Sequence, residues 1–357
     1  MTVTKNYSLV LQKINELSFE DRPEPVIVHD TDVIVQILLT GICGSDVHFY
    51  THGRIGDFVV KKPFILGHES AGIVTKVGSE VTRVKVGDRI CLEPGTPCHV
   101  CSLCLGGQYN HCAKMHFAAA PPVDGTLTKY FKISETFCYK LPDNISVDEG
   151  ALMEPLSVAV HAVKQAEIKP GSSVVVFGAG PVGLLVAAVA KNAYGAALTV
   201  IVDINKERLA FAKENFGVET YLSVKGMTAK EAGNDLMEVF NLSIERGFEF
   251  AMDATGVPYC IQSALYTLRP RGSFVQIGMG ADNADLPIST ICFRELNVKG
   301  SFRYNGRDFE QAVGLVARGV VDVKNLISSK VDFAQAKDAF ELVRQGKGLK
   351  TLISGPE

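Results

Sequence analysis

Four cysteines, Cys98, Cys101, Cys104 and Cys112, lie within fifteen residues in a stretch rich in glycine, proline and polar residues. Four thiolates suit the tetrahedral coordination of Zn²⁺, and a complete sulfur shell leaves no position for a substrate. Buried structural thiols rarely follow so regular a spacing, and disulfides are rare in reducing compartments. The spacing therefore predicts a structural zinc site, and the alternative is a set of free or redox-active thiols.

A second group of potential metal ligands is dispersed along the chain. Cys43 lies in the segment GICGSD, His68 and Glu69 lie in GHE, and Glu154 precedes a proline. One thiolate, one imidazole and a carboxylate can hold zinc while a fourth position stays open for an alcohol oxygen, as catalytic zinc requires. Spacing alone does not assemble this site, because each residue also fits an ordinary role as a core thiol, a core histidine or a helix-start acid.

A glycine-rich turn, GAGPVG, directly follows the apolar stretch at 174–177 and opens an apolar helix. Its glycines permit a tight turn, and the helix N-terminus offers unpaired N–H groups to a pyrophosphate. Asp203 follows twenty residues after Gly183, where a carboxylate accepts both ribose hydroxyls and repels a 2′-phosphate. The pattern predicts NAD rather than NADP; Arg208 either weakens that preference or lies on a solvated helix face. The turn residues assigned to the cofactor are Gly178, Gly180, Pro181, Val182 and Gly183.

Two kinds of domain are needed to position these residues. Up to about residue 155, short β-rich runs at 31–39, 71–77 and 88–92 are separated by Gly, Pro and Asp turns, which predicts a mostly β domain. Farther on, apolar strands alternate with helical patterns, which predicts parallel βαβ crossovers. The alternating segments are strands at 174–177, 198–202, 248–252 and 273–277 and helices from 183, near 206–215 and near 259–268.

The pattern changes again beyond about residue 295. A strand is predicted at 296–302, helices near 309–317 and 334–344, and an apolar strand at 351–353. We interpret this mixed tail as a segment that returns to the first domain.

Composition excludes several classes of function. A chain of 357 residues predicts two domains at about 150 residues each. With 46% apolar and 21% charged residues, most of it should fold. The net charge of -3 provides no positive field for nucleic acid or anionic lipid. Because the N-terminal sequence also lacks the uninterrupted apolar core of a signal peptide, we expect a cytoplasmic protein.

The segments GICGSDVHFYTHGRIGDFVVKKP, LGHES, VGDRI, EPGTPC, PPVDGTL and EPLSVAVHA carry a resemblance to a known family. Over essentially the whole chain, the sequence resembles the zinc-containing medium-chain dehydrogenases, and within them the polyol branch. The resemblance implies an α/β protein with a GroES-like β-rich catalytic domain at 1–155 and 296–357. It also implies a Rossmann coenzyme domain with a doubly wound parallel sheet at 156–295, two Zn²⁺ per subunit, NAD as cofactor, and a homotetramer or dimer.

The same resemblance implies roles for the dispersed ligands. Cys43, His68 and Glu69 match the ligands of a catalytic zinc. Glu154 matches a carboxylate that either ligates the metal or holds its water, so which of the two glutamates binds stays open. Members that oxidise ethanol carry a second cysteine at the position of Glu154, and a site with fewer thiolates has more affinity for a second hydroxyl.

Further residues match the family's proton relay and binding sites. Ser45 matches the hydroxyl residue beside the substrate, and His48 matches the base at the outer end of the relay. The residues that match the polyol-contacting set are Tyr50, Phe117, Glu154, Arg303 and Tyr304. Those that match the cofactor site beyond the glycine turn are Asp203, Arg208, Ile277, Gly278, Met279, Phe302 and Arg303.

The expected reaction is oxidation of a secondary hydroxyl of a linear polyol to a ketose, with hydride transfer to NAD. Xylitol and D-xylulose are the expected pair, and oxidation of L-arabinitol or sorbitol is the main alternative, because the pocket residues recur across the branch. A dinucleotide-binding structural protein without turnover is an alternative of another class. The intact Cys43, His68 and Ser45 argue against it.

Overall fold

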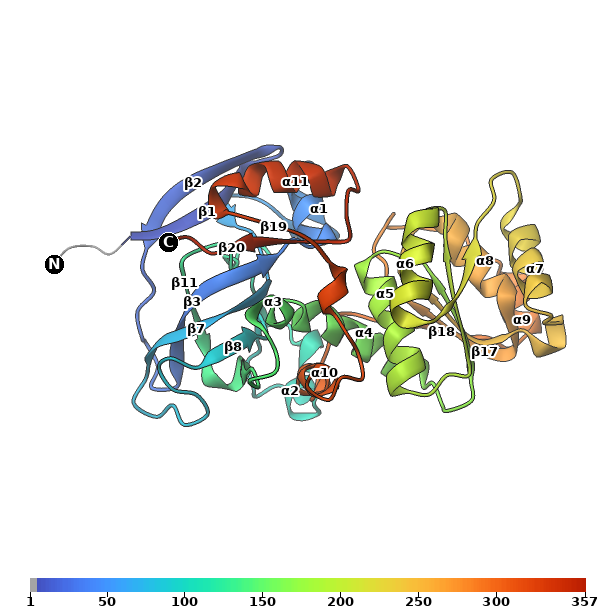
Figure 1. Cartoon of the computed structure of the whole chain (residues 1–357), viewed down its shortest axis with the longest axis horizontal. Coiled ribbons are helices and arrows are strands. Elements are labelled where there is room, and N and C mark those ends of the chain that lie inside the picture. Colours follow the sequence, from blue (N-terminus) through green and yellow to red (C-terminus); the bar gives the residue numbers. More distant parts are fainter. Residues whose placement is uncertain (1–4) are drawn as a thin grey trace. The chain divides into compact units, whose positions relative to one another are not determined.

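The computed structural model describes residues 5–357, which form two compact units (Figure 1). Unit 1 comprises the described residues up to Glu154 together with Asn305–Ala317 and Asp322–Glu357. Unit 2 comprises Pro155–Tyr304 and Arg318–Val321. Within the described residues, no helix combines the length and the apolar character needed to cross a membrane.

Unit 1 is built on a seven-stranded sheet in which β3 is central. Its order is β12-β8-β7-β3-β20-β19, and β11 also pairs with β3. Val33, Val35 and Ile37 alternate along β3 and pack with Val74 and Leu92 in one core cluster. The strands are β3 (Asp32–Gly41), β7 (Glu69–Val77), β8 (Arg89–Leu92), β11 (Tyr130–Ser134), β12 (Cys138–Lys140), β19 (Ile327–Val331) and β20 (Lys350–Ser354).

The C-terminal segment contributes to this sheet. Strand β20 pairs antiparallel with β3 and parallel with β19, so the end of the chain lies beside a strand formed near its beginning. Helix α11 (Ala336–Arg344) packs on α1 (Gly44–His52), the helix that follows β3 (Figure 1). A second sheet has the order β2-β1-β6, with β1 at Lys5–Lys13, β2 at Glu16–Pro23 and β6 at Phe64–Ile65.

Unit 2 contains a six-stranded, entirely parallel sheet of order β15-β14-β13-β16-β17-β18. The predicted α/β fold with parallel crossovers is confirmed. The order reverses between β13 and β16, and ligands bind at the carboxyl ends of strands at such a point. The strands are β13 (Ser173–Phe177), β14 (Leu198–Asp203), β15 (Glu219–Leu222), β16 (Phe248–Asp253), β17 (Leu268–Gln276) and β18 (Asn297–Gly300); the helices are α5 (Pro181–Ala188), α6 (Lys206–Phe216), α7 (Ala229–Val239), α8 (Pro258–Thr267) and α9 (Ile288–Phe293).

One predicted strand is shorter than expected. Strand β18 ends at Gly300 rather than at Phe302, because its last partner is Gln276, where the neighbouring strand β17 itself ends. The remaining strands and α-helices are β4 (Arg54–Ile55), β5 (Phe58–Val59), β9 (Gly95–Thr96), α2 (Ser102–Leu105), β10 (His116–Phe117), α3 (Val147–Gly150), α4 (Met153–Ala166) and α10 (Asp308–Ala317).

Candidate functional site

Unit 1 brings together three of the predicted metal ligands. One ligand atom each from Cys43, His68 and Glu69 lies within 4.8 Å of the others. The register of the main sheet explains this meeting, because Gly41 at the end of β3 pairs with Glu69 at the start of β7. Cys43 follows two residues after Gly41 as the N-cap of α1, and His68 directly precedes β7. Both glutamate and histidine are buried.

Asp46, which the sequence reasoning did not single out, organises this cluster. Its Oδ2 accepts the backbone N–H of Cys43 at 3.2 Å, and its Oδ1 accepts that of Gly67 at 2.9 Å. Oδ1 also lies 3.4 Å from Nδ1 of His68. Burial disfavours a charge on His68, but Asp46 and Cys43 outweigh it and raise the pKa of the imidazole above its usual value. A carboxylate beside one ring nitrogen orients the imidazole so that the other can bind a metal.

The donors fit a zinc ion. Sulfur, imidazole nitrogen and carboxylate oxygen are the three ligand types that Zn²⁺ takes in proteins, and a set of three is typical of catalytic sites. The cluster among the described residues does not include Glu154, whose buried side chain lies in the first turn of α4.

Glu69 makes a buried ion pair with Lys350, the first residue of β20. Nζ of Lys350 lies 2.8 Å from Oε1 and 2.6 Å from Oε2 of Glu69, and it donates to the carbonyl of Ile42 at 3.2 Å. Burial disfavours the ammonium, but the charges of Glu69, Cys43 and Glu154 more than offset this and raise its pKa. Sequence reasoning missed Lys350; its only signal is a charged residue at the start of an apolar terminal strand.

The two residues predicted for the proton relay lie on α1. Ser45 is half-buried in its first turn, and His48 is exposed one turn later. Nδ1 of His48 lies 2.8 Å from the carbonyl oxygen of Arg54, and its ring stacks on that of His52 at 4.4 Å. The exposed imidazole can exchange protons with water.

The aromatic residues predicted to contact substrate lie in different surroundings. Phe117 on β10 is buried, and its ring centroid lies 5.9 Å from that of His68. Tyr50 is also buried, but its hydroxyl donates to Oε1 of Glu341 on α11 at 2.8 Å. Phe117 therefore borders the metal-ligand cluster, whereas the hydroxyl of Tyr50 is held by α11.

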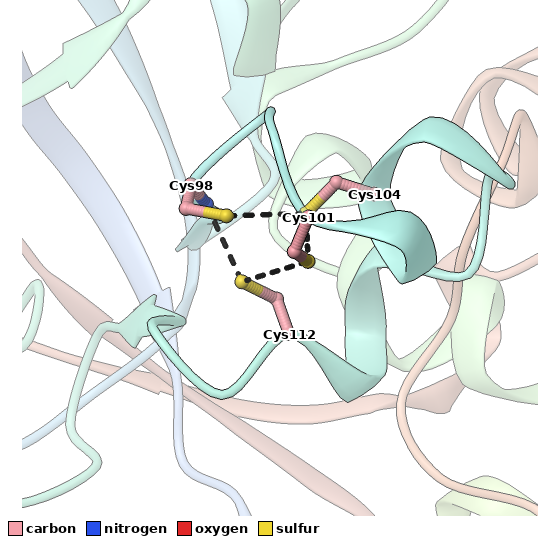
Figure 2. A group of neighbouring side chains, drawn as sticks. All are labelled: Cys98, Cys101, Cys104 and Cys112. Atoms are coloured by element: carbon pink, nitrogen blue, oxygen red, sulfur yellow. Dashed lines mark hydrogen bonds between the residues drawn. The ribbon is translucent and has the colours of Figure 1, made fainter.

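The four clustered cysteines converge on one point (Figure 2). Sγ of Cys101 lies 3.4 Å from Sγ of Cys104 and 4.0 Å from that of Cys112, and the Sγ atoms of Cys98 and Cys104 are 3.9 Å apart. A tetrahedron with Zn–S bonds of about 2.3 Å has sulfurs about 3.8 Å apart. The backbone N–H groups of Val100 and Cys101 lower the pKa of the Cys98 thiol to about 6, which favours its thiolate, whereas burial and the neighbouring thiols raise the pKa of Cys104.

A buried carboxylate anchors the loop that carries these cysteines. Glu93 is 1% exposed; it accepts the hydroxyl of Tyr109, within the cysteine loop, at 2.6 Å and that of Tyr139, on β12, at 2.8 Å. Burial raises the pKa of Glu93 to about 7, although both phenols favour its charged form. The ring of Tyr139 in turn stacks on Phe309 of α10 at 4.8 Å. Sequence reasoning missed this cluster as well.

Replacing Cys101 with serine is expected to lower bound zinc by about one ion per chain and to lower the melting temperature, because a structural metal contributes its binding free energy to folding. Metal analysis and thermal unfolding measure the two effects. Cys292→Ser, at an exposed cysteine outside both clusters, is the control. Unchanged zinc content in Cys101→Ser would exclude a structural zinc site.

In unit 2 the glycine turn has the geometry of a pyrophosphate cradle. Gly178 has a φ of 101°, and a Cβ on Gly183 would lie 1.8 Å from the carbonyl oxygen of Gly178. Gly180 is the N-cap of α5, and a Cβ there would meet no atom within 4 Å, so the space above the helix N-terminus is open. Asp203 at the end of β14 accepts the N–H of Ala179 at 2.6 Å. These features fit a dinucleotide.

A pocket of about 640 Å³ adjoins this turn. Asp203 and Arg208, both predicted, line it together with Lys225, which the sequence reasoning did not name. A carboxylate that can bind ribose hydroxyls therefore shares the pocket with two cationic side chains.

The other predicted cofactor residues lie after β17 and β18. Gly278 is packed so closely that a Cβ would lie 2.4 Å from the backbone nitrogen of Gly256, whereas Met279 is 64% exposed. Ile277 is half-buried between β17 and Gly278. After β18, the guanidinium of Arg303 lies 4.7 Å from the ring centroid of Phe302, and Tyr304 is buried. Pro181 and Val182 form the first turn of α5.

Known proteins resemble the chain over its whole length. A family model described as the alcohol dehydrogenase GroES-like domain matches residues 29–143, and one described as zinc-binding dehydrogenase matches residues 181–318. D-xylulose reductase A of Aspergillus niger is 53% identical over 354 residues, which cover 99% of this chain and 98% of the relative.

Solved structures share the fold. An oxidoreductase of unknown specificity from Escherichia coli has a TM-score of 0.91 at 30% identity, with coverage of 99% of this chain and 100% of that one. L-idonate 5-dehydrogenase from Escherichia coli has a TM-score of 0.88 at 28% identity, with coverage of 98% of both chains.

Proposed function

The chain belongs to the zinc-containing medium-chain dehydrogenase family, and we propose that it oxidises xylitol to D-xylulose with NAD as hydride acceptor. The observation that carries the catalytic part of this proposal is the convergence of the half-buried Cys43 with the buried His68 and Glu69. The substrate part rests on the full-length identity to a D-xylulose reductase. As part of the proposal, residues 1–155 and 296–357 form the GroES-like catalytic domain and residues 156–295 the Rossmann NAD-binding domain.

The residues have separate roles in the proposed reaction. When bound, zinc supplies a Lewis acid that makes a substrate hydroxyl more acidic. Ser45 would accept the hydroxyl proton, and the exposed His48, at the outer end of the relay, would release it to solvent. Glu154 replaces a second thiolate with a carboxylate, which favours a ligand with two adjacent hydroxyls. The residues proposed to contact the polyol are Tyr50, Phe117, Glu154, Arg303 and Tyr304.

A panel of polyols tests the substrate assignment by following NAD reduction optically. Xylitol is expected to give the highest kcat/KM. A higher value for L-arabinitol or sorbitol would move the assignment to that polyol within the same family. If no polyol is oxidised while NADH still binds, the chain is a dinucleotide-binding protein without turnover.

We also propose a cytoplasmic homotetramer or dimer with two zinc ions per subunit, one in each ligand cluster. The edge of the unit 2 sheet supports the assembly, because β18 is an edge strand whose Val298 is 45% exposed, and nearby Phe293 is 89% exposed. Light scattering of the purified protein tests the number of subunits, and metal analysis tests the number of zinc ions per chain. A monomer in solution, or fewer than two zinc ions per chain, would contradict them.

Replacing Asp203 with alanine is expected to raise the ratio of kcat/KM for NADP to that for NAD at least tenfold. The carboxylate no longer repels a 2′-phosphate, and Arg208 and Lys225 remain in the pocket. A hydrogen bond to a charged group is worth about 1.5–3 kcal/mol, equivalent to a tenfold or larger change.

Because Asp203 also accepts the N–H of Ala179, the alanine variant alone would mix loss of charge with loss of that bond. Asp203→Asn keeps an acceptor oxygen and removes the charge, so it should shift the same ratio in the same direction. An unchanged ratio in both variants would show that Asp203 does not select the cofactor.

A further inference from the structure

Lys350 has an unusual place in unit 1. Its side chain is 4% exposed, and no other lysine among residues 5–357 is buried. A buried ammonium is costly unless it is paired and hydrogen-bonded. Lys350 meets this condition with two oxygens of Glu69 and the carbonyl of Ile42, the residue that precedes Cys43.

The sheet is built so that this pair can form. Strand β3 lies between β7 and β20, and Gly41 at its end is paired with Glu69 on one side and with Leu352 on the other. A Cβ on Gly41 would lie 2.3 Å from Oε2 of Glu69. The missing side chain at Gly41 therefore leaves the space that the carboxylate of Glu69 occupies when it reaches Lys350.

The positive charge of Lys350 lies beside a group of metal ligands that carries negative charge. A cysteine thiolate and a glutamate carboxylate together balance the two charges of Zn²⁺. Further negative charge from the buried Glu154 would leave an excess in a site shielded from water. A carboxylate with two free oxygens can also bind zinc through both, whereas both oxygens of Glu69 accept hydrogen bonds from Lys350.

We propose that Lys350 is a positioning residue of the catalytic metal site. It holds both oxygens of Glu69, so that this carboxylate does not bind the metal through both of them and leaves one ligand position to the substrate. The proposal rests on the proposed function, because it assumes that the cluster of Cys43, His68 and Glu69 holds zinc. Lys350 acts through Glu69 and touches neither substrate nor cofactor.

Cobalt substitution tests the proposal without relying on turnover. The visible spectrum of Co²⁺ at the catalytic site is obtained as the difference between the wild-type protein and Cys43→Ala, which retains only the site of four cysteines. In Lys350→Met, the released carboxylate is expected to raise the coordination number, so the visible bands should weaken at least twofold. The kcat should fall about 10- to 100-fold, as is typical when a partner of a metal ligand is lost. Lys350→Arg, which keeps the positive charge, should restore most of the intensity of the cobalt bands and most of kcat.

The decisive comparison uses a background in which Glu69 cannot act as a charged ligand. In Glu69→Gln, adding Lys350→Met is expected to change neither the cobalt spectrum nor kcat by more than about twofold, because Lys350 acts through the carboxylate. This comparison remains valid if Lys350→Met alone fails to fold. Lys330→Met, which breaks the exposed pair with Asp148, is the matched control.

The outcomes are distinguishable. An unchanged cobalt spectrum in Lys350→Met, or an equal effect of Lys350→Met in both backgrounds, would overturn the positioning role and leave the proposed function intact. If Cys43→Ala takes up as much cobalt as the wild-type protein, the cluster does not hold the metal, and the proposed function fails with it.

Discussion

Cys43→Ala is expected to lower kcat/KM for polyol oxidation by about a thousandfold or more and to remove about one zinc ion per chain. The variant loses the only thiolate of the cluster of Cys43, His68 and Glu69. Lewis-acid stabilisation of a developing charge is worth several kcal/mol, or about three powers of ten in rate. The backbone should tolerate the change, because Cys43 is the N-cap of α1 and Asp46 remains to accept its N–H.

Cys91→Ala is the matched control. Cys91 on β8 is fully buried, burial raises the pKa of its thiol, and it belongs to neither metal-ligand cluster of the described chain. This variant should lose some stability but keep both zinc ions and nearly normal kcat per folded molecule. If Cys43→Ala keeps activity within tenfold of the wild-type value, or if both variants lose the same activity, Cys43 is not a ligand of a catalytic metal.

The sequence predicts those features of the structure that are determined by residues close together in the chain. Strand β13 and the turn from Gly178 to Gly183 are recognisable because an apolar strand, a glycine turn and a helix follow one another directly. The four cysteines are equally local, since all lie within fifteen residues at a spacing typical of metal sites.

Residues whose role depends on long-range pairing were not predictable in the same way. Lys350 reaches Glu69 only because β20 pairs with β3, which is some 300 residues earlier in the chain. The hairpin of β1 and β2 was missed for a related reason. Charged residues interrupt β2, and Leu9 of β1, which is buried, donates its backbone N–H to the carbonyl of Leu127, far along the chain.

Asp46 and Glu93 illustrate a third limit. Both are acidic residues within motifs whose neighbouring cysteines and glycines draw attention, and nothing in their spacing shows that they are buried. Only the folded chain shows that Asp46 supports His68 and Cys43, and that Glu93 is enclosed by two phenols. Burial raises the pKa of a carboxyl group, and whether a residue is buried depends on the whole fold.

Glu93 leads to a prediction of how stability depends on pH. In an unfolded chain a glutamate has a pKa of about 4.3, whereas burial raises the pKa of Glu93 to about 7 in the folded protein. Between these values the folded state holds a proton that the unfolded state has released. The contribution of Glu93 to the free energy of unfolding is therefore largest below about pH 4.5, falls as the pH rises, and is lost above about pH 7.

Glu93→Gln is expected to remove this dependence, because the amide stays neutral, accepts one tyrosine hydroxyl and can donate to the other. Relative to the wild-type protein, the variant should gain about 3 kcal/mol in the free energy of unfolding between pH 5 and pH 8, since each pKa unit corresponds to about 1.4 kcal/mol. Urea unfolding of both proteins at the two pH values measures this. Release of zinc at low pH affects both proteins and largely cancels in their difference.

Glu80→Gln removes the same charge at an exposed position and should show no comparable gain. A second variant, Tyr139→Phe, tests the physical cause, because removing one phenol donor destabilises the charged carboxylate further and should steepen the loss of stability toward high pH. If Glu93→Gln and the wild-type protein keep a constant difference from pH 5 to pH 8, Glu93 is ionised alike in the folded and unfolded chains. The carboxyl group of Glu93 would then bind no proton on folding. The hydrogen bonds from Tyr109 and Tyr139 would have to stabilise its charge as much as burial disfavours it.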